Sequence, residues 1–455
     1  MRRKFYLLLG LLLVASMVLA GCGNKQATTS APAATQAPAA TKAPAATEAP
    51  AATKAPSATE APKAKEVTLT IGFTESQTGK FNVDSTAQTQ GLELWMEQIN
   101  AAGGVKLSDG TVVKFKAVSY DDESKTDKVQ QLYTRLATED KADFLISPYS
   151  SGLTAAAAVV SEQYGKIMLA TGAASDSIFK KGYEGVYQLY TPSSRYLIGA
   201  VDLLQSVDPN LKKIAIVYEN GKFATGVAKV AKEHAEKKGY DVVLFEGYDA
   251  STTDFSAFIN KIQDSGAEAV LGGGHFQDGE TFARQIAEKK LPIKFLALVV
   301  APPNPKFAEL GDAALGVVGP SQWEPAAAYT PETAKKVGLA WFGPSSAEFA
   351  KAYKEKYNDD ADYHAAGGYA AGVVLQKAII DADSVDPDKV KAALDKMDIL
   401  TFFGHIKFDT GDAHGLQLGH EMVYIQWQKE GDKLVKQVVW PQEAATAKLL
   451  YPLTR

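Results

Sequence analysis

Cysteine is nearly absent from this 455-residue sequence, which contains only Cys22, close to its start. The rest of the chain can therefore form no internal disulfide bond, thiolate metal site or cysteine nucleophile. Long apolar runs are also scarce. Only Leu7 to Ala20, about fourteen residues, is predominantly apolar, whereas a membrane span needs about 20 residues. The sequence predicts neither a disulfide-stabilised nor a membrane-spanning domain.

Motifs typical of catalytic and nucleotide-binding sites are missing as well. The sequence contains no GxGxxG, GxxxxGK[ST], GxSxG or HExxH pattern, so a hydrolase or a dehydrogenase on an α/β fold is disfavoured. We expect no catalytic residue, no metal ligand and no cofactor. The six histidines show no metal-ligand spacing; they are His234, His275, His364, His405, His414 and His420.

The part of the chain that we expect to fold has more acidic than basic residues. The whole chain carries a net charge of −5. Three cations in the first four residues, with five Lys and two Glu in residues 22–65, contribute +6 to that total, which leaves about −11 for residues 66–455. An acidic body disfavours nucleic acid and anionic lipid as partners. We therefore expect a small-molecule partner and no nucleic acid.

The first residues have the layout of a secretory signal, with a basic start, Met1-Arg2-Arg3-Lys4, before the apolar run. The run ends in Leu19-Ala20-Gly21-Cys22, which resembles the lipobox of bacterial lipoproteins. That resemblance implies a signal peptide over residues 1–21 and a lipid anchor, including palmitate, on Cys22. We expect the protein on the outer face of the cytoplasmic membrane, held by the anchor alone. This is the cell surface in a single-membrane bacterium and the periplasmic side otherwise.

Residues 22–65 differ from the rest in composition, because the unit Ala-Pro-Ala-Ala-Thr recurs and large apolar residues are missing. Such a segment cannot bury enough surface to offset the entropy of ordering it. Frequent proline keeps a chain locally extended. We expect a disordered tether between the anchor and the folded domain.

From residue 66 onward, short apolar runs alternate with amphipathic stretches, which is typical of a parallel sheet covered by helices. The alternation restarts near Thr191, so we expect an α/β protein with two doubly wound parallel-sheet lobes. Lobe 1 would comprise residues 66–190 and about 324–398, and lobe 2 residues 191–323 and about 399–455. The expected strands are 67–73, 112–119, 144–146, 166–171, 213–218, 242–245, 269–271, 293–298, 404–408, 422–428 and 434–440. The expected later helices are 226–238, 255–262, 276–287, 347–357, 364–381 and 389–397.

The loop after the run Phe144-Leu145-Ile146 is the leading candidate for a binding site. It carries Ser150 and Ser151 directly before an Ala/Val-rich helical stretch. Free backbone N–H groups and the positive end of the helix dipole at that point suit a carboxylate. The alternative is that the serines only cap the helix. Ligands of open α/β sheets bind at the carboxyl ends of the strands, where this loop lies.

The whole domain resembles a type I periplasmic solute-binding protein, in the Leu/Ile/Val-binding-protein-like branch that serves branched-chain amino acid and amide ABC importers. The resemblance covers about residues 66–445. It rests on Thr78-Gly79, Ile99-Asn100-Ala101-Ala102-Gly103-Gly104-Val105, Tyr120-Asp121-Asp122, Ser150-Ser151, Lys213-Ile214-Ala215-Ile216-Val217, Gly272-Gly273-Gly274, Gln322-Trp323-Glu324-Pro325, Thr401-Phe402-Phe403-Gly404-His405-Ile406-Lys407-Phe408 and Ile425-Gln426-Trp427.

This resemblance implies two lobes joined by a three-segment hinge that close over a small ligand. It implies that Ser151 holds the ligand carboxylate, with groups from the next loop, Gly172, Ala173, Ala174 and Ser175. In the second lobe Phe223 and His275 stand where tyrosines are usual. Val299 stands where an acid usually pairs with a ligand ammonium. Glu75, Glu219, Asp278 and Glu324 lie on nearby loops and are the alternative acids.

Two side chains near the cleft each allow two interpretations. His275 can either donate to a ligand or cap a helix, and Trp323 can either line the pocket or belong to the core. The aromatic supply near the cleft consists of Tyr149, Tyr218, Phe223, Phe276 and Trp323.

We expect a non-catalytic, monomeric receptor that passes a small carboxylate-bearing solute to the transmembrane subunits of an ABC permease. Branched-chain or other hydrophobic amino acids are the first candidates. Aromatic or aliphatic carboxylates, amides and urea are the alternatives, as is a ligand sensor for a signalling receptor.

Overall fold

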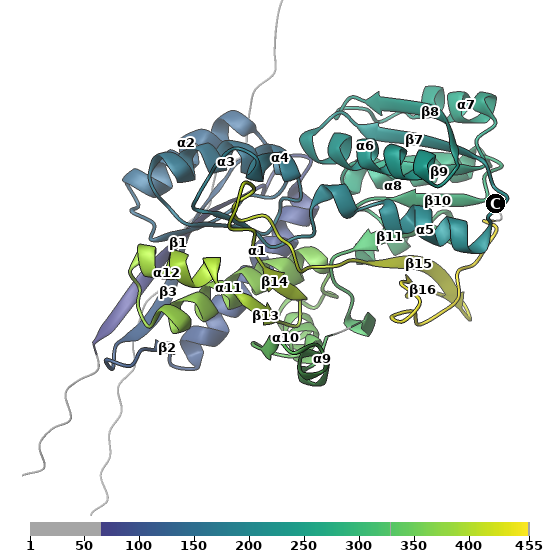
Figure 1. The fold of residues 1–455 in the computed structure, drawn as a ribbon. Coiled ribbons are helices and arrows are strands. Elements are labelled where there is room, and N and C mark those ends of the chain that lie inside the picture. Colours follow the sequence, from purple (N-terminus) through teal and green to yellow (C-terminus); the bar gives the residue numbers. More distant parts are fainter. Residues whose placement is uncertain (1–64, 328, 454–455) are drawn as a thin grey trace, which may run out of the picture. The chain divides into compact units, whose positions relative to one another are not determined.

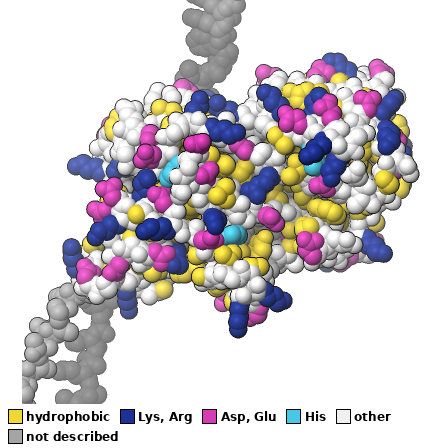
Figure 2. Space-filling view, viewed as in Figure 1, with side chains coloured by type: hydrophobic (Ala, Val, Ile, Leu, Met, Phe, Trp, Pro, Cys, Tyr) yellow, Lys and Arg dark blue, Asp and Glu magenta, His cyan; other side chains and the backbone are white. Residues whose placement is uncertain are grey.

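The computed structural model describes residues 65–327 and 329–453. The predicted signal peptide, Cys22 and almost all of the tether lie outside the described residues. Within the described part, no helix is both long and apolar enough to cross a membrane. Figure 2 shows acidic and basic side chains interspersed over the visible face of the domain.

The first sheet has six strands in the order β2-β3-β1-β4-β5-β6, all parallel except β2. Its short central strands are buried along their whole length, which is why they read as continuous apolar runs. The strands are β1 (Glu66–Glu75), β2 (Val105–Lys106), β3 (Val112–Asp121), β4 (Phe144–Ile146), β5 (Met168–Ala170) and β6 (Val186–Gln188).

Helices cover both faces of this sheet (Figure 1). α2 and α3 pack with their apolar faces on one side, while α1 and α11 belong to the core on the other side. The helices of this first segment are α1 (Asn82–Ala101), α2 (Thr126–Thr138), α3 (Ser151–Gln163) and α4 (Asp176–Phe179).

The second sheet has seven strands in the order β16-β15-β11-β10-β9-β7-β8. Its helices, including short 3-10 turns (η), are η1 (Ser193–Arg195), α5 (Ile198–Val207), α6 (Lys222–Lys237), α7 (Ser256–Ser265), α8 (Phe276–Glu288) and η2 (Pro305–Ala313). Its strands are β7 (Lys213–Glu219), β8 (Asp241–Tyr248), β9 (Ala269–Gly273), β10 (Phe295–Leu298), β11 (Val318–Ser321), β15 (Val423–Glu430) and β16 (Lys433–Trp440).

The second sheet departs from the predicted all-parallel order at one edge. β15 runs antiparallel to β11, and β16 runs antiparallel to β15, to which it is joined by the two-residue connection Gly431-Asp432 and not by a helical crossover. Strands β2, β6 and β11 and helix α5 were not predicted from the sequence, since three of them have only two to four residues. Helix α6 begins at Lys222, four residues before its predicted start.

The chain between β11 and β15 forms a small three-stranded sheet and a group of helices that pack on the first lobe. They are η3 (Pro325–Ala327), α9 (Pro331–Val337), β12 (Ala340–Trp341), α10 (Ser346–Tyr357), α11 (Tyr363–Ala382), α12 (Pro387–Asp395), β13 (Asp398–Leu400) and β14 (His405–Lys407).

Helices α1 and α11 approach each other closely because glycine stands where they meet. A Cβ atom on Gly91 would collide with the Ala365 carbonyl, and one on Gly368 with the Gln88 carbonyl. This contact fixes the buried face of α1, including Asp84 and Gln88, against the N-terminal turns of α11.

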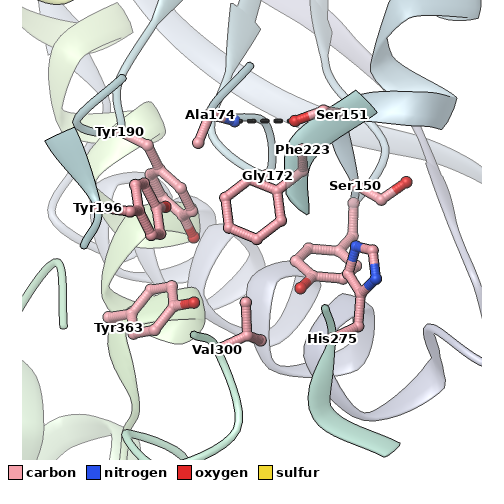
Figure 3. Close-up of a pocket in the computed structure, with 11 residues that line it drawn as sticks. Ser150, Ser151, Gly172, Ala174, Tyr190, Tyr196, Phe223, His275, Val300 and Tyr363 are labelled. Carbon is pink, nitrogen blue, oxygen red and sulfur yellow. Dashed lines mark hydrogen bonds between the residues drawn. The ribbon is translucent and has the colours of Figure 1, made fainter. Parts of the chain in front are cut away.

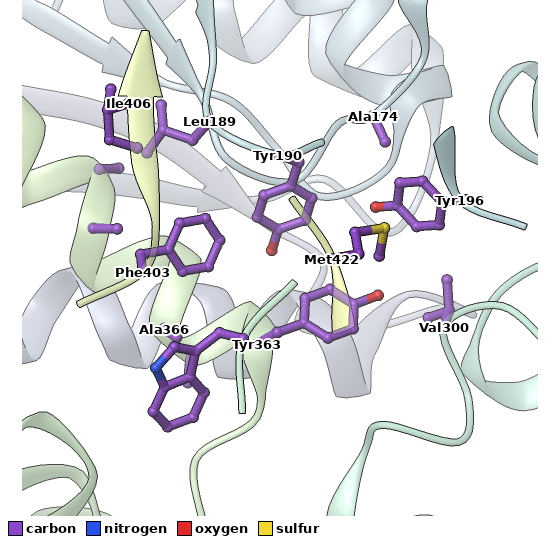
Figure 4. Packing of buried hydrophobic residues seen from close by; sticks show 14 of the residues in the cluster. Ala174, Leu189, Tyr190, Tyr196, Val300, Tyr363, Ala366, Phe403, Ile406 and Met422 are labelled. Carbon is purple, nitrogen blue, oxygen red and sulfur yellow. The ribbon is translucent and has the colours of Figure 1, made fainter. Parts of the chain in front are cut away.

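The chain passes between the two sheets three times, after β6, after β11 and before β15. Residues 405–417 stay with the first sheet, since the Gln188 N–H donates to the Gly415 carbonyl and Tyr187 and Asp395 form a hydrogen bond beside it. We therefore propose that the third crossover follows Gln417, later than the boundary near residue 398 expected from the sequence. Aromatic and apolar side chains pack around the crossovers (Figure 4).

Candidate ligand pocket

A small pocket lies between the two lobes (Figure 3). The loops that line it follow β4 and β5 of the first sheet and β7, β9 and β10 of the second, at the carboxyl ends of the strands. The lining residues are Tyr149, Ser150, Ser151, Gly172, Ala174, Tyr190, Tyr196, Phe223, His275, Val300 and Tyr363.

The N-terminus of α3 forms one wall of the pocket. Ser150 is the N-cap, and its side-chain oxygen accepts the N–H of Leu153 at 3.3 Å. Its backbone has a positive φ of 82°, which is uncommon for a residue other than glycine. The first N–H groups of a helix have no partner inside the helix, so this end of α3 presents donors and a positive dipole toward the pocket.

Ser151 holds the neighbouring loop and keeps a proton to donate. Its Oγ accepts the N–H group of Ala174 at 3.1 Å (Figure 3) and that of Ser175 at 3.0 Å. A hydroxyl that accepts two hydrogen bonds still has its own O–H to give. Capping of the helix and binding of a ligand by this serine pair are therefore compatible, because the Ser150 oxygen caps the helix while the Ser151 O–H is left to donate.

Gly172 brings its backbone close to the pocket because no side chain fits there. A Cβ atom would collide with Gln88 Oε1 and lie 2.8 Å from the Cα of Tyr149. The Gly172 carbonyl accepts the N–H of Ser150 at 3.0 Å, which ties the two binding loops of the first lobe together.

The second lobe contributes Phe223 in the first turn of α6 and His275 at the N-cap of α8. The two rings lie 6.0 Å apart, and the His275 ring also packs against Phe81 and Tyr149 of the first lobe. His275 is therefore a cap and a pocket wall together. Its backbone N–H donates to Asp278 at 2.9 Å.

Glu219 links the lobes at the edge of the pocket. Its carboxylate lies 2.8 Å from Lys80 Nζ of the first lobe and 2.5 Å from His275 Nδ1 of the second. Burial opposes ionisation, but His275 and Lys80 together lower the pKa of Glu219 to about 2. The carboxylate is therefore ionised at neutral pH and holds both partners.

Glu219, His275 and Asp278 have potential metal-ligand atoms within 4.8 Å of one another. Their existing partners explain this proximity without a metal. Lys80 neutralises Glu219, and Asp278 accepts from His275 N–H and from the Tyr248 hydroxyl. An ammonium on one of three ligands disfavours a divalent cation there.

Aromatic rings dominate the pocket, and three of them were not predicted from the sequence: Tyr190, Tyr196 and Tyr363. Tyr190 follows β6 at the first crossover, and Tyr363 begins α11. The Tyr190 ring lines the pocket, whereas its hydroxyl is buried and lies, like Thr171 Oγ1, against Gly367 of α11. The sequence held a signal for Tyr190, because this residue directly precedes Thr191, where the crossing between the lobes is predicted. No local signal existed for Tyr363, which is brought in by the return of the chain.

Val299 is buried in the core at 1% exposure, and the pocket is lined by its neighbour Val300 instead. Val300 has a positive φ of 63°, a strained conformation for a β-branched residue. Val300, like Val299, is not acidic, so this loop presents no carboxylate to the pocket, as the sequence predicted.

Three residues proposed from the sequence do not line the pocket. Ala173 is fully buried, and its side chain joins the core beneath α3. Ser175 lies on a separate surface groove beside α4 and α6, where its hydroxyl contacts Ser177. Trp323 packs in the core against Phe349, with its indole N–H bonded to Ser346 at 3.1 Å.

The other seven proposed residues come together in the pocket. The second lobe contributes Phe223 and His275. The first lobe contributes the other five, which are Tyr149, Ser150, Ser151, Gly172 and Ala174. The remaining aromatic candidates have other contacts, since Tyr218 packs on Phe245 and Phe276 lies in the core of the second lobe.

The four alternative acids all have partners of their own. Glu219 and Asp278 belong to the network described above, and Glu324 lies 3.0 Å from Lys436. Glu75 accepts from the Thr86 hydroxyl at 3.0 Å. None of the four is among the residues lining the pocket.

The geometry is that of a receptor. One end offers donors for an anion, the walls are aromatic, and residues of both lobes enclose the space between them. This arrangement can select and retain a solute.

Comparisons with known proteins agree with this architecture. Residues 68–432 match the family described as periplasmic binding protein. A relative from Brucella suis biovar 1, called Leu/Ile/Val-binding protein homolog 7, is 30% identical over 375 residues, which cover 80% of this chain and 89% of the relative. A relative from Brucella abortus, called Leu/Ile/Val-binding protein homolog 8, is 27% identical over 381 residues, which cover 80% and 88%.

Solved structures share the fold. The branched-chain amino acid transporter substrate binding protein LivJ from Streptococcus pneumoniae, in complex with isoleucine, has a TM-score of 0.67 and 22% identity, over 82% of this chain and 100% of that one. An ABC transporter solute binding protein from R. palustris, in complex with 4-hydroxybenzoate, has a TM-score of 0.68 and 18% identity, over 82% and 96%.

Proposed function

Because the chain belongs to the periplasmic binding protein family, we propose that it captures a small carboxylate-bearing solute, foremost a branched-chain or other hydrophobic amino acid, for an ABC importer. Proteins of this family bind small ligands and work with ABC permeases; they are not enzymes. The observation that carries the proposal is the N-terminus of α3, with Ser151, facing an aromatic pocket between two lobes.

The carboxylate would lie against α3. The free donors of the first helical turn, the Ser151 hydroxyl and the helix dipole all favour negative charge at that position. The Gly172–Ala174 segment adds backbone next to the same place. The second lobe completes the enclosure with Phe223 and His275.

The body of the ligand would be apolar. Tyr149, Tyr190, Tyr196, Phe223 and Tyr363 supply rings, and Val300 supplies an aliphatic wall. Burying a leucine-sized side chain there contributes about 1.5–3 kcal/mol. The names of the two Brucella relatives point to the same ligand class.

A second candidate ligand is an aromatic carboxylate. The R. palustris structure holds 4-hydroxybenzoate, and the rings of this pocket could stack on an aromatic acid. The anchoring of the carboxylate at α3 would be the same for both candidates.

The proposed setting is outside the cytoplasmic membrane. Cys22 would carry the lipid, residues 22–65 would act as a tether, and the folded part would deliver ligand to the permease as a monomer. Lobe 1 would consist of residues 66–190 with most of the 324–418 segment, and lobe 2 of residues 191–323 with the C-terminal strands.

A thermal-shift screen of the purified domain tests the ligand class. A ligand that binds only the folded state raises the free energy of unfolding, by about 2.7 kcal/mol at a free concentration of a hundred times its Kd. The melting temperature rises as a result. We expect leucine, isoleucine, phenylalanine or benzoate to raise it, and serine to raise it less. A screen in which only neutral amides or sugars stabilise the domain would contradict the proposal.

A further inference from the structure

A second pocket lies beside the first and third crossovers, where α5 meets the start of β15 and the end of β16 (Figure 1). It shares no lining residue with the ligand pocket, because Tyr190 lines the ligand pocket whereas the next residue, Thr191, lines the second one. We call this second space the hinge-side pocket. Its apolar wall consists of Ile198, Met422, Tyr424, Trp440 and Pro441.

The wall of the hinge-side pocket is fixed by the packing of Tyr424 on α5. A Cβ atom on Gly199 would lie only 2.3 Å from the Tyr424 ring, so glycine is what allows the ring to pack there. The Tyr424 hydroxyl accepts the Gly199 N–H at 3.0 Å and donates to the Tyr196 carbonyl at 2.9 Å. Both hydrogen-bonding functions of this hydroxyl are therefore used in holding the wall.

Arg195 lines the hinge-side pocket with an incomplete set of partners. It is half-buried, and its guanidinium donates to the Gln417 carbonyl at 3.1 Å. Among the described arginines, Arg135 pairs with Glu139 at 3.5 Å and Arg284 is exposed, whereas Arg195 has no carboxylate within ion-pair distance. A guanidinium has five N–H donors, and a partly buried charge without a counter-charge is costly. The free donors of Arg195 therefore favour an anionic group in this pocket.

Trp440 adds a second free donor to the same pocket. The other four tryptophans each donate their indole N–H to an oxygen; they are Trp95, Trp323, Trp341 and Trp427. The indole N–H of Trp440, which is half-buried, has no such partner among the described residues. A tryptophan N–H away from water usually finds an acceptor. Two donors without their usual partners thus line one small space.

Three carboxylates also line the hinge-side pocket, and they are not equivalent. Asp202 has a cation of its own, because Lys238 Nζ lies 2.8 Å from its carboxylate. Glu421 and Glu443 are exposed, and neither forms an ion pair with a described residue. Burial lowers the pKa of Arg195, and the charge of Glu421 opposes this shift although the two groups are not in contact. The pocket therefore holds one unpaired cation within and two unpaired acids at its rim.

A zwitterion with an apolar body satisfies all of these groups together. A carboxylate can accept from the Arg195 fork and from an indole N–H, whereas an ammonium is attracted by the rim acids. We propose that the hinge-side pocket binds a small amphipathic zwitterion of the hydrophobic α-amino acid class, with its carboxylate at Arg195 and Trp440. Its ammonium lies toward Glu421 and Glu443, and its side chain lies on the apolar wall. This site is separate from the ligand pocket and does not depend on the function proposed for that pocket.

The position of the hinge-side pocket connects it with closure of the lobes. Thr191 belongs to the first crossover and Met422 to the third, and both line the pocket. A ligand whose affinity differs between the open and closed forms shifts the equilibrium between them. An occupant of this site would thus act on the two segments that join the lobes, without contacting the transported solute.

Fluorine NMR of protein labelled with 5-fluorotryptophan tests the proposal. The chain has five tryptophans, and the signal of Trp440 is the one that disappears in Trp440→Phe. L-phenylalanine should shift this signal in a saturable titration. 3-Phenylpropanoate, which lacks the amino group, and 2-phenylethylamine, which lacks the carboxylate, should each need at least about tenfold higher concentration for half of the shift.

Two variants assign the ends of the ligand. Arg195→Gln, whose amide can still donate to the Gln417 carbonyl, should raise the Kd of phenylalanine at the Trp440 signal at least about tenfold. The double variant Glu421→Gln/Glu443→Gln should weaken phenylalanine about threefold and leave 3-phenylpropanoate unchanged. Because both glutamates are exposed, the double variant should fold as wild type and keeps the test decisive if Arg195→Gln does not fold. Arg284→Gln, an exposed position on α8, is the control and should change nothing.

Ser151→Ala separates this site from the ligand pocket. It should leave the midpoint of the Trp440 titration unchanged, because Ser151 lines only the ligand pocket. If the midpoint followed Ser151→Ala and ignored Arg195→Gln, the signal would report closure around the ligand pocket and the second site would be overturned. A Trp440 signal that does not move with phenylalanine, or that moves equally with 3-phenylpropanoate, would also overturn it. None of these results bears on the proposed function, which the thermal-shift screen tests.

Discussion

The hydroxyl of Thr191 lies 2.8 Å from Nδ1 of His420 and joins the first crossover between the sheets to the third. His420 Nε2 lies 2.9 Å from the Phe403 carbonyl, which can only accept, so Nε2 carries the proton and Nδ1 accepts from Thr191. The Thr191 N–H donates to Gln322 Oε1 of the second crossover at 2.9 Å. One threonine thus connects all three segments on which hinge motion would depend.

This arrangement predicts an acid-sensitive hinge. Burial lowers the pKa of His420 to about 3, although the bond to Phe403 opposes the shift. Above pH 6.5 the His420 imidazole is neutral in both the folded and the unfolded state, so its full contribution to stability is present. Between pH 6.5 and pH 3 the unfolded state binds the proton preferentially, so the free energy of unfolding falls. The loss due to His420 should be about 2 kcal/mol at pH 5.

Thermal melts of wild type and His420→Gln at pH 7 and pH 5 measure this loss. Glutamine can donate to Phe403 and accept from Thr191 without titrating, so its melting temperature should fall less. Parallel pH profiles for the two proteins would rule out His420 as the sensitive group.

Lys80→Met should weaken closure of the lobes. The Lys80–Glu219 pair joins them at 2.8 Å, but Lys80 is 34% exposed, so the pair contributes only about 0.5–1 kcal/mol. Ligand affinity should fall about two- to fivefold. Small-angle scattering should show the wild-type domain becoming more compact at saturating ligand, and the variant needing more ligand for the same change. An unchanged scattering profile at saturation would indicate a rigid pocket.

Ser151→Ala should weaken a carboxylate ligand by about 1.5–3 kcal/mol, the range for a hydrogen bond to a charged group. This corresponds to about ten- to a hundredfold in Kd. The corresponding amide, leucinamide for leucine, should lose much less. Ser161→Ala, on the same helix but bonded to the Lys166 carbonyl, is the control and should leave both affinities unchanged. Equal losses for acid and amide would remove Ser151 from the carboxylate site.

Cys22→Ser should release the folded domain from the membrane, or leave the precursor uncleaved. The expectation comes from the sequence Leu19-Ala20-Gly21-Cys22. Fractionation of cells that express each form is the measurement. If the Cys22→Ser protein still required detergent for release, the lipobox interpretation would be wrong.

The sequence by itself determined the alternation of strands and helices, since a strand buried on both faces must read as an apolar run, as in Phe144-Leu145-Ile146. It also placed Ser150 and Ser151 correctly at a strand-to-helix turn, because capping is a local property of a few adjacent residues. Only the tertiary structure decided which loops meet. Trp323, a good candidate from its position, packs in the core, while Tyr363 reaches the pocket through the contact of α11 with α1. That contact joins residues nearly three hundred positions apart, and no local pattern encodes a packing partner at that distance.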